Sequence, residues 1–395
     1  MSTIAQSPVS PAAAAKTLPD TSLPLNQTGL AIEILEAETQ KTIGMEPVHE
    51  ADFSEAIHEN WRENHLRKGL IKASPDDLPI EAILIADKEN PARCLGYALT
   101  MPGPDGKTAH SVFSVYSLDF VARRGIQRLR QNGKIEKDTA TFYRLAYQPG
   151  LLPAAEKPAN QTGMTVVRQK PELHYLRVPL APLLDRATTD PLPLGLSGEE
   201  KAFPVFFTEK ALQQAEECSR KGAVDNPNFE SGGVLAGSLA SCPDTGEFFA
   251  IVHAVFPATD TEETLVSLTF SGKSWARIQS IVQARQKIQP AFRLLGNCHG
   301  HNFVPNDGQT CEACPTREHC DSHNLFCSAD DREWTRAVFG KNPFQLCQIF
   351  GLTARGDHAR GLFGLHDGRL NLREFHIMPD FNPADYKNDS TGSVR

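Results

Sequence analysis

Two histidines with one residue between them end an apolar segment, F-R-L-L-G-N-C-H-G-H, at residues 292–301. The pattern of this segment predicts a β-strand, and on an extended strand residues i and i+2 point to the same face. His299 and His301 can therefore direct both imidazoles at one point. The segment predicts half of a zinc site.

A carboxylate would complete such a site. A catalytic zinc needs three protein ligands and one open position for water, and two histidines with one carboxylate are a recurrent ligand set. Asp331, in F-C-S-A-D-D-R-E-W at residues 326–334, can supply that carboxylate. The stretch S-A-D-D-R-E also has the pattern of a helix N-cap, with acidic residues at the positive end of the helix.

Zinc lowers the pKa of a water that it binds, but another carboxylate is needed to take the proton of that water and pass it to a leaving amine. Glu230, in N-F-E-S-G-G-V-L-A-G, is the candidate. It begins a predicted strand in which Gly232 and Gly233 let neighbouring backbones approach closely. This setting fits the wall of a site better than a surface loop.

Taken in order, F-E-S-G-G-V-L-A-G, H-G-H and S-A-D-D resemble the glutamate, H-x-H and S-x-x-D motif of the JAMM/MPN (also JAB) zinc metalloproteases. The resemblance covers residues 203–379. It implies zinc-dependent hydrolysis of isopeptide or peptide bonds after the C-terminus of a ubiquitin-like modifier. Glu230 would then be the acid/base, and Ser328 would hydrogen-bond the oxyanion. The spacing from Ser328 favours Asp331 over Asp330 as the third ligand.

The chain departs from the family pattern after His301, where asparagine stands in place of the usual proline and residues 302–327 are inserted before Ser328. The insertion contains C-x2-C-x5-C-x6-C. Its thiols are those of Cys311, Cys314, Cys320 and Cys327. Four soft ligands in a short loop favour a second, structural zinc, which would fold a segment too small for its own core. An iron–sulfur cluster and unliganded cysteines are the alternatives.

A length of 395 residues with 40% hydrophobic content predicts two domains with flexible ends. The predicted parts are a disordered start at 1–28, an N-terminal α/β domain at 29–148, a proline-rich linker at 149–200, a metalloprotease domain at 201–379 and a disordered tail at 380–395. The linker contains one apolar segment, at 173–184, that we expect to dock. For the metalloprotease domain the pattern predicts an α+β fold, and the resemblance implies the cytidine-deaminase-like α-β-α arrangement of MPN/JAB domains.

Periodicity predicts the elements of that domain. The expected strands are 231–239, 248–256, 292–301, 344–352, 361–365 and 370–377. One helix is expected at 211–221, capped by Thr208 and ended by Gly222. Another at 271–285 places Trp275, Ile278 and Val282 on one face, and a third begins at Ser328.

The N-terminal block repeats some features of the C-terminal domain in the same order, among them Phe53, Glu81 and Phe142 against Phe206, Glu230 and Phe292. Two interpretations are open: a duplicated MPN-like plan without metal ligands, or two unrelated α/β domains. Near the start of this block, Phe53, Ile57 and Trp61 form the apolar face of a helix, which favours core packing.

The net charge of −8 and pI near 5.9 argue against nucleic-acid binding, and no apolar run is long enough to span a membrane. The N-terminal sequence lacks the features of a signal peptide, so we expect a cytoplasmic location, where clustered thiols hold metal more often than they form disulfides. The expected partners are a ubiquitin-like protein or its conjugate, together with proteins of its conjugation pathway.

The leading hypothesis is thus a zinc isopeptidase that removes or matures a ubiquitin-like modifier. Two rivals are a hydrolase of the JAB type that acts on a small sulfur-carrier protein adduct, and a non-catalytic scaffold whose cleft only binds. Glu230 favours the two enzyme hypotheses over the scaffold, because a protein that only binds does not need an acid/base residue beside a complete set of metal ligands.

Overall fold

A computed structural model shows a mixed α+β fold, as the sequence predicts. It describes residues 18, 22–66, 75, 78–91, 93–103, 107–148, 173–190, 203–225, 230–258, 261–264, 267–270, 272–301, 325–339, 342, 344–352 and 358–390. Within these residues, no helix is long and apolar enough to cross a membrane.

The chain forms two compact units, each made of segments that are not continuous in sequence. Unit 1 comprises Met1–Asp52, Glu81–Thr100 and Val112–Ala159, and unit 2 comprises Phe53–Ile80, Met101–Ser111 and Asn160–Arg395. Residues 53–80 therefore belong with the C-terminal part of the chain, although the sequence suggested a single N-terminal domain at 29–148. The cause is apolar packing, because Trp61 lies in the core cluster of unit 2.

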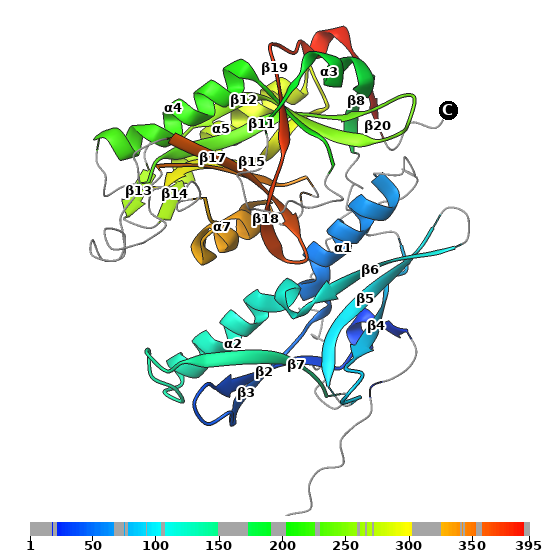
Figure 1. Cartoon of the computed structure of the whole chain (residues 1–395), viewed down its shortest axis with the longest axis vertical. Coiled ribbons are helices and arrows are strands. Elements are labelled where there is room, and N and C mark those ends of the chain that lie inside the picture. The colour runs from blue at the N-terminus through cyan, green and yellow to red at the C-terminus, as the bar shows by residue number, and fades with distance from the viewer. Residues whose placement is uncertain are drawn as a thin grey trace, which may run out of the picture. The chain divides into compact units, whose positions relative to one another are not determined.

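Most of unit 1 is one sheet with one helix along it. The strand order is β1-β4-β5-β7-β2-β3, with β6 beside β5. The strands are β1 (Leu23–Pro24), β2 (Leu30–Glu36), β3 (Thr42–Pro47), β4 (Glu81–Ala86), β5 (Cys94–Pro102), β6 (Thr108–Ser114) and β7 (Thr141–Tyr147). Helix α2 (Asp119–Gln131) packs against β2 and β3 (Figure 1). Short 3₁₀ turns are Leu25–Gln27, Glu50–Phe53 and Val115–Leu118.

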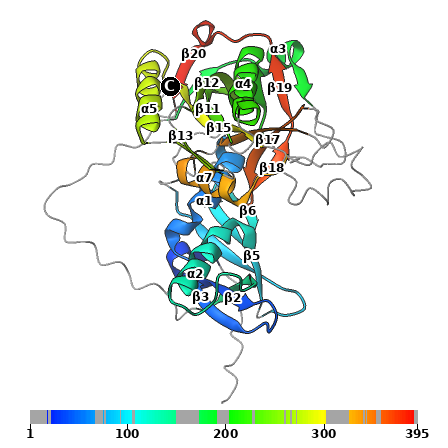
Figure 2. The same ribbon diagram turned by 90° about the vertical axis from the view of Figure 1, so that its left-hand side faces the viewer.

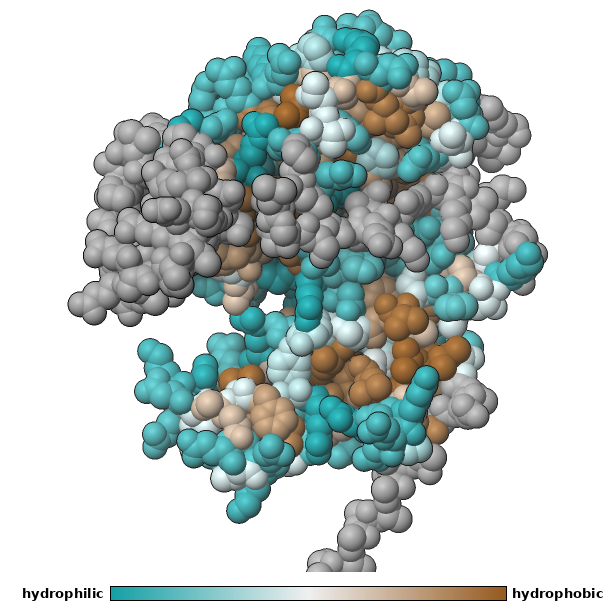
Figure 3. Space-filling view, in the orientation of Figure 1, coloured by the Kyte–Doolittle hydropathy of each residue, from teal (hydrophilic) through white to brown (hydrophobic). Residues whose placement is uncertain are grey.

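Apolar side chains are exposed on unit 1. Figure 3 shows apolar atoms gathered on its surface, over β5 and β6. The large exposed apolar residues of this unit are Ile83, Leu95, Val112, Tyr116 and Phe142.

The idea of a duplicated plan gains no support from the strand pairings. The described pairings of the unit 1 sheet are antiparallel, whereas the unit 2 sheet includes parallel pairs. Phe53 and Phe142, two of the positions that suggested it, also lie in different units.

Unit 2 is built on an eleven-stranded sheet, with the order β18-β17-β16-β15-β11-β12-β10-β19-β9 and with β8 joining β11 to β20. Its strands are β8 (His174–Arg177), β9 (Thr188–Asp190), β10 (Val205–Thr208), β11 (Gly232–Ser241), β12 (Phe248–Pro257), β15 (Phe292–His301), β16 (Leu346–Leu352), β17 (His358–His366), β18 (Arg369–Arg373), β19 (Phe375–Met378) and β20 (Lys387–Ser390). A separate hairpin pairs β13 (Thr261–Thr264) with β14 (Ser267–Phe270).

Helices cover both faces of this sheet. They are α1 (Ser54–Trp61), α3 (Leu180–Arg186), α4 (Glu209–Asp225), α5 (Gly272–Gln286) and α7 (Ala329–Phe339). Leu235 of β11 packs with Ala211 and Leu212 of α4, while the adjacent Val234 packs with Ile278 of α5 on the opposite face. Figure 2 shows α4 and α5 on opposite sides of β11, β12 and β15.

The predicted helices are confirmed, with one boundary corrected. Thr208 caps α4, because its Oγ1 accepts the N–H of Ala211 at 3.2 Å. The predicted end at Gly222 is wrong, since α4 continues to Asp225. Gly222 lies inside the helix, so it does not take the left-handed conformation with which a glycine commonly ends a helix.

The strand predicted at 370–377 is two strands, β18 and β19, that separate after Arg373. β18 pairs with β17, while β19 pairs with β10 and β9 at the other end of the sheet order. One predicted strand therefore contributes to both ends of the strand order, which its periodicity does not reveal.

Parts of the chain predicted to be disordered or linking are ordered. Leu23–Pro24 pairs with β4, and the predicted tail contains a 3₁₀ turn, Pro383–Asp385, followed by β20. β20 is held because it pairs with β8. The apolar centre of the linker docks as predicted, since β8 also pairs with β11.

Candidate metal centre

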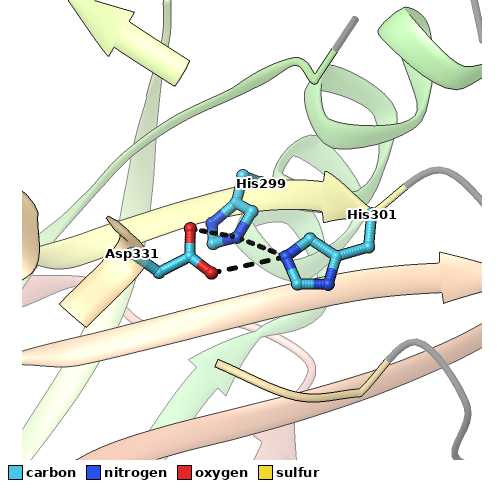
Figure 4. A group of neighbouring side chains, drawn as sticks. All are labelled: His299, His301 and Asp331. Carbon is cyan, nitrogen blue, oxygen red and sulfur yellow. Dashed lines mark hydrogen bonds and ion pairs between the residues drawn. The ribbon is translucent and has the colours of Figure 1, made fainter. Parts of the chain in front are cut away.

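The two predicted histidines lie together at the end of β15. β15 runs parallel to β16 and antiparallel to β11, so both imidazoles are carried by an interior strand. His299 is 2% exposed and His301 is 6% exposed. Their Nε2 atoms are 3.0 Å apart (Figure 4). Alternation along the strand thus brings the two rings to one point, as expected.

Asp331 reaches the same point from the first turn of α7 (Figure 4). Its Oδ1 lies 3.2 Å from His299 Nε2, and its Oδ2 lies 3.5 Å from His301 Nε2. The competing residue, Asp330, is exposed. The structure therefore groups His299, His301 and Asp331, and these three can hold a metal ion.

Ser328 fixes the start of α7 and the carboxylate of Asp331 together. Its Oγ accepts the N–H of Asp331 at 3.0 Å, and its own N–H donates to Asp331 Oδ2 at 2.8 Å. This reciprocal arrangement is a capping box with aspartate in the place of glutamate. The same carboxylate therefore caps a helix and faces the two histidines.

The separations between the donor groups are compatible with zinc. Two ligand atoms held about 2.0–2.1 Å from one zinc ion at the tetrahedral angle lie about 3.3 Å apart. The two Nε2 atoms are 3.0 Å apart, and each has one Asp331 oxygen near this distance, Oδ1 at 3.2 Å from His299 and Oδ2 at 3.5 Å from His301. Three protein ligands leave one position of a tetrahedron for water, which is the arrangement of catalytic sites.

The electrostatic surroundings of Asp331 favour binding of a cation. Burial by itself would raise the pKa of Asp331, but the charge and hydrogen bonds of His299 and His301 outweigh burial and hold that pKa well below its usual range. The carboxylate is therefore ionised and ready to act as a ligand.

Glu230 lies at the start of β11, next to the end of β15. The N–H of Gly300 donates to the carbonyl of Ser231 at 2.9 Å, which ties the two segments together. One carboxylate oxygen of Glu230, Oε2, is buried and has no hydrogen-bond partner among the described residues. Burial raises the pKa of Glu230 to about 7, with a lowering effect from His301 and raising effects from Asp331 and Asp330. A carboxyl group with this pKa, beside a metal ligand, is suited to exchange protons near neutral pH.

Gly232 permits the close approach of β11 to β15 that the sequence suggested. It pairs with His299, and a Cβ at this position would overlap the carbonyl oxygen of Cys298. A larger residue would push β11, and Glu230 with it, away from the histidines.

Asn297 supports His299 and was missed by the sequence analysis. Since His299 Nε2 faces the other ligands, its Nδ1 must carry the proton. Nδ1 lies 3.4 Å from Asn297 Nδ2, while Asn297 Oδ1 is buried without a described partner. With the amide turned by 180°, Oδ1 accepts the Nδ1 proton. The i, i+2 alternation that identified the two histidines also places Asn297 on their face.

Most of the predicted cysteine site lies outside the described residues, because Cys311, Cys314 and Cys320 fall in 302–324. Cys327 is described, and its hydrogen bond with Cys347, followed by burial, raises the pKa of Cys347 well above its usual value. Beside Cys327, the exposed ring of Phe326 contacts that of His301, with centroids 4.8 Å apart. Cys298 packs in the core as predicted, with its Sγ 3.7 Å from that of Cys218.

Comparison with known proteins adds no family. No protein-family model matches the chain, and no curated protein matches it. The geometry of the site therefore carries the functional argument.

Proposed function

We propose that the protein is a zinc-dependent isopeptidase or peptidase that cleaves after the C-terminus of a ubiquitin-like modifier. The observation that carries the proposal is the buried group of His299, His301 and Asp331, with Glu230 beside it at a pKa of about 7. The resemblance to JAMM/MPN metalloproteases supports the substrate class. Helices on both faces of the sheet agree with an MPN-like fold.

Each residue has a task in such a hydrolysis. Bound zinc supplies the lowered pKa of a water and the polarisation of the substrate carbonyl. His299, His301 and Asp331 hold the ion and leave one position open. Glu230 takes a proton from the attacking water and gives it to the leaving amine as the C–N bond breaks.

In this proposal Ser328 stabilises the oxyanion. Its Oγ already accepts the N–H of Asp331, so its own hydroxyl proton can point toward the substrate carbonyl. A donor held rigidly at a helix cap stabilises negative charge without reorganising when that charge develops.

The first experiment measures zinc per chain by elemental mass spectrometry. The wild type should carry one zinc that is lost from His299→Ala and from His301→Ala. Any zinc of the cysteine insertion should remain in both variants and be lost from Cys311→Ser/Cys314→Ser. Unchanged zinc content in the histidine variants would refute the proposed site.

The second experiment changes Glu230→Ala. Cleavage of ubiquitin-like conjugates should fall by about 10²–10⁴-fold, because the variant lacks the proton carrier, while zinc stays bound. Asp330→Asn is the control, since it removes an exposed neighbouring charge that is no ligand. Turnover retained by Glu230→Ala would contradict the mechanism. A wild type that binds zinc and modifier but cleaves nothing would favour the scaffold.

A further inference from the structure

Helix α1 lies far from the metal ligands in sequence but belongs to their unit. Three charged side chains, Glu55, Glu59 and Arg62, follow one another at the i, i+4, i+7 spacing of one helical face. They are only 7%, 4% and 3% exposed. Charges so deeply buried need partners, because an unpaired one costs several kcal/mol. The residues that these three side chains contact show which elements α1 holds in place.

Glu55 binds α7, the helix that carries Asp331. Its Oε2 accepts Arg332 Nη2 at 2.6 Å and its Oε1 accepts Arg332 Nη1 at 3.3 Å. Arg336, one turn further along α7, places its Nε 3.2 Å from the same Oε2. One carboxylate thus holds two successive turns of α7, starting at the residue after the metal ligand.

Glu59 of α1 and Arg62, which directly follows α1, bind the region where β17 turns into β18. Both oxygens of Glu59 accept the N–H of Asp367, at 2.9 and 3.0 Å, and Arg62 donates to the carbonyl of Leu365. Arg332 links the two attachments, because its Nε donates to the carbonyl of Gly368 at 2.7 Å. Helix α1, the start of α7 and this turn therefore form one connected polar network.

We propose that Glu55 is a positioning residue for Asp331, and that the metal-binding unit is complete only when α1 is present. This proposal rests on the proposed zinc site. Asp331 can complete the ligand set only while the first turn of α7 keeps its place beside β15. Ser328, directly before α7, caps that turn locally, whereas Glu55 attaches it to another element. Without the Glu55 carboxylate, Arg332 and Arg336 lose the anion that both contact.

The test compares zinc affinity, by chelator competition, in full-length wild type and Glu55→Gln. The variant keeps the shape of the side chain but loses its charge, and its affinity for the histidine-dependent zinc should fall about tenfold, as outer-shell changes typically do. Asp190→Asn is the matched control. It removes a bidentate pair with Arg360, at 2.9 and 3.1 Å, in the same unit but away from α7.

Two further measurements distinguish a specific loss of zinc affinity from a general loss of stability. The unfolding midpoints of Glu55→Gln and Asp190→Asn should be similar, while only the first loses zinc affinity. Arg332→Gln should weaken zinc binding, and adding it to Glu55→Gln should give less than the summed effect, because both changes break one contact. If Glu55→Gln does not fold, Arg336→Gln, which leaves the Arg332 contact intact, is measured instead.

Unchanged zinc affinity in the folded variant would overturn the role of Glu55 and leave the proposed function standing. An equal loss in Asp190→Asn would overturn it too, because the effect would then not be specific to α7. Zinc content that does not depend on His299 would overturn both proposals together.

Discussion

Asn297 gives the sharpest test at the scale of single residues. Replacing Asn297→Ala removes the acceptor for the His299 Nδ1 proton, so the ring loses its preferred tautomer and orientation. We expect zinc affinity to fall about 10–100-fold, with His299 and His301 unchanged. Chelator competition on the purified full-length chain measures this directly.

Gln348 provides the control for that change. It pairs with Cys298 on the neighbouring strand and so faces the opposite side of the sheet from His299. It is as deeply buried as Asn297. Gln348→Leu should leave zinc affinity as it is. If it weakens binding as much as Asn297→Ala, the Asn297 effect is general repacking and not orientation of His299.

Local patterns made the three residues of the candidate metal centre predictable. His299 and His301 follow from alternation on one strand, and Asp331 from the S-x-x-D spacing of the motif that the chain resembles. Glu55 could not be found in this way, because its contact with Arg332 joins residues 277 positions apart. Only the folded chain brings a glutamate of that helix to the metal-ligand segment.

At the scale of elements, Gly232 controls the distance between β11 and β15. In Gly232→Ala the new methyl group would meet the backbone of Cys298, so the strands must separate or bend. Overpacking of this kind costs about 1–3 kcal/mol. Chemical unfolding should show that loss, and zinc binding should weaken because both histidines lie on β15, next to the added methyl group.

Gly272 is the matched position for comparison. A Cβ there meets nothing within 4 Å, and the residue begins α5. Gly272→Ala should therefore change neither stability nor zinc affinity appreciably. A Gly232→Ala protein as stable as this control would show that the close approach is not needed.

Helices and strands with one continuous hydrophobic periodicity were predictable. Strands whose boundaries depend on pairing with residues far away in sequence were not. β12 and α5 match their predicted ranges to within one or two residues, because burial alone sets their periodicity. β18 and β19 looked like one strand, since both alternate apolar with polar residues and only Glu374 lies between them. Their separation depends on β17 and β10, whose positions the local pattern does not contain.

At the scale of the whole molecule, zinc should stabilise unit 2 alone. A ligand that binds only the folded state stabilises it by about 2.7 kcal/mol at one hundred times its Kd. Removing zinc with a chelator should therefore speed hydrogen exchange in β15 and α7, while β2 and β7 of unit 1 keep their protection. Exchange mass spectrometry resolves these peptides separately.

His299→Ala serves as the reference in that experiment, because its exchange should no longer respond to the chelator in β15 and α7. Equal loss of protection in β2 and β7 would contradict a stabilisation restricted to unit 2. The two units could not be delimited from composition, since each is assembled from separated segments and composition shifts mark only continuous boundaries.

The attachment of α1 to α7 also sets an order in time. Arg332 follows Glu55 by 277 residues, so at about 5–20 residues per second a ribosome needs about 14–55 s to make the partner after the helix. During that interval Glu55, Glu59 and Arg62 must remain hydrated, and the apolar side of α1 has only part of its core available. If unit 1 folds first, α1 stays partly unpacked on the nascent chain until the later segments of unit 2 have been made. A gene fragment that starts at the predicted linker would never supply it.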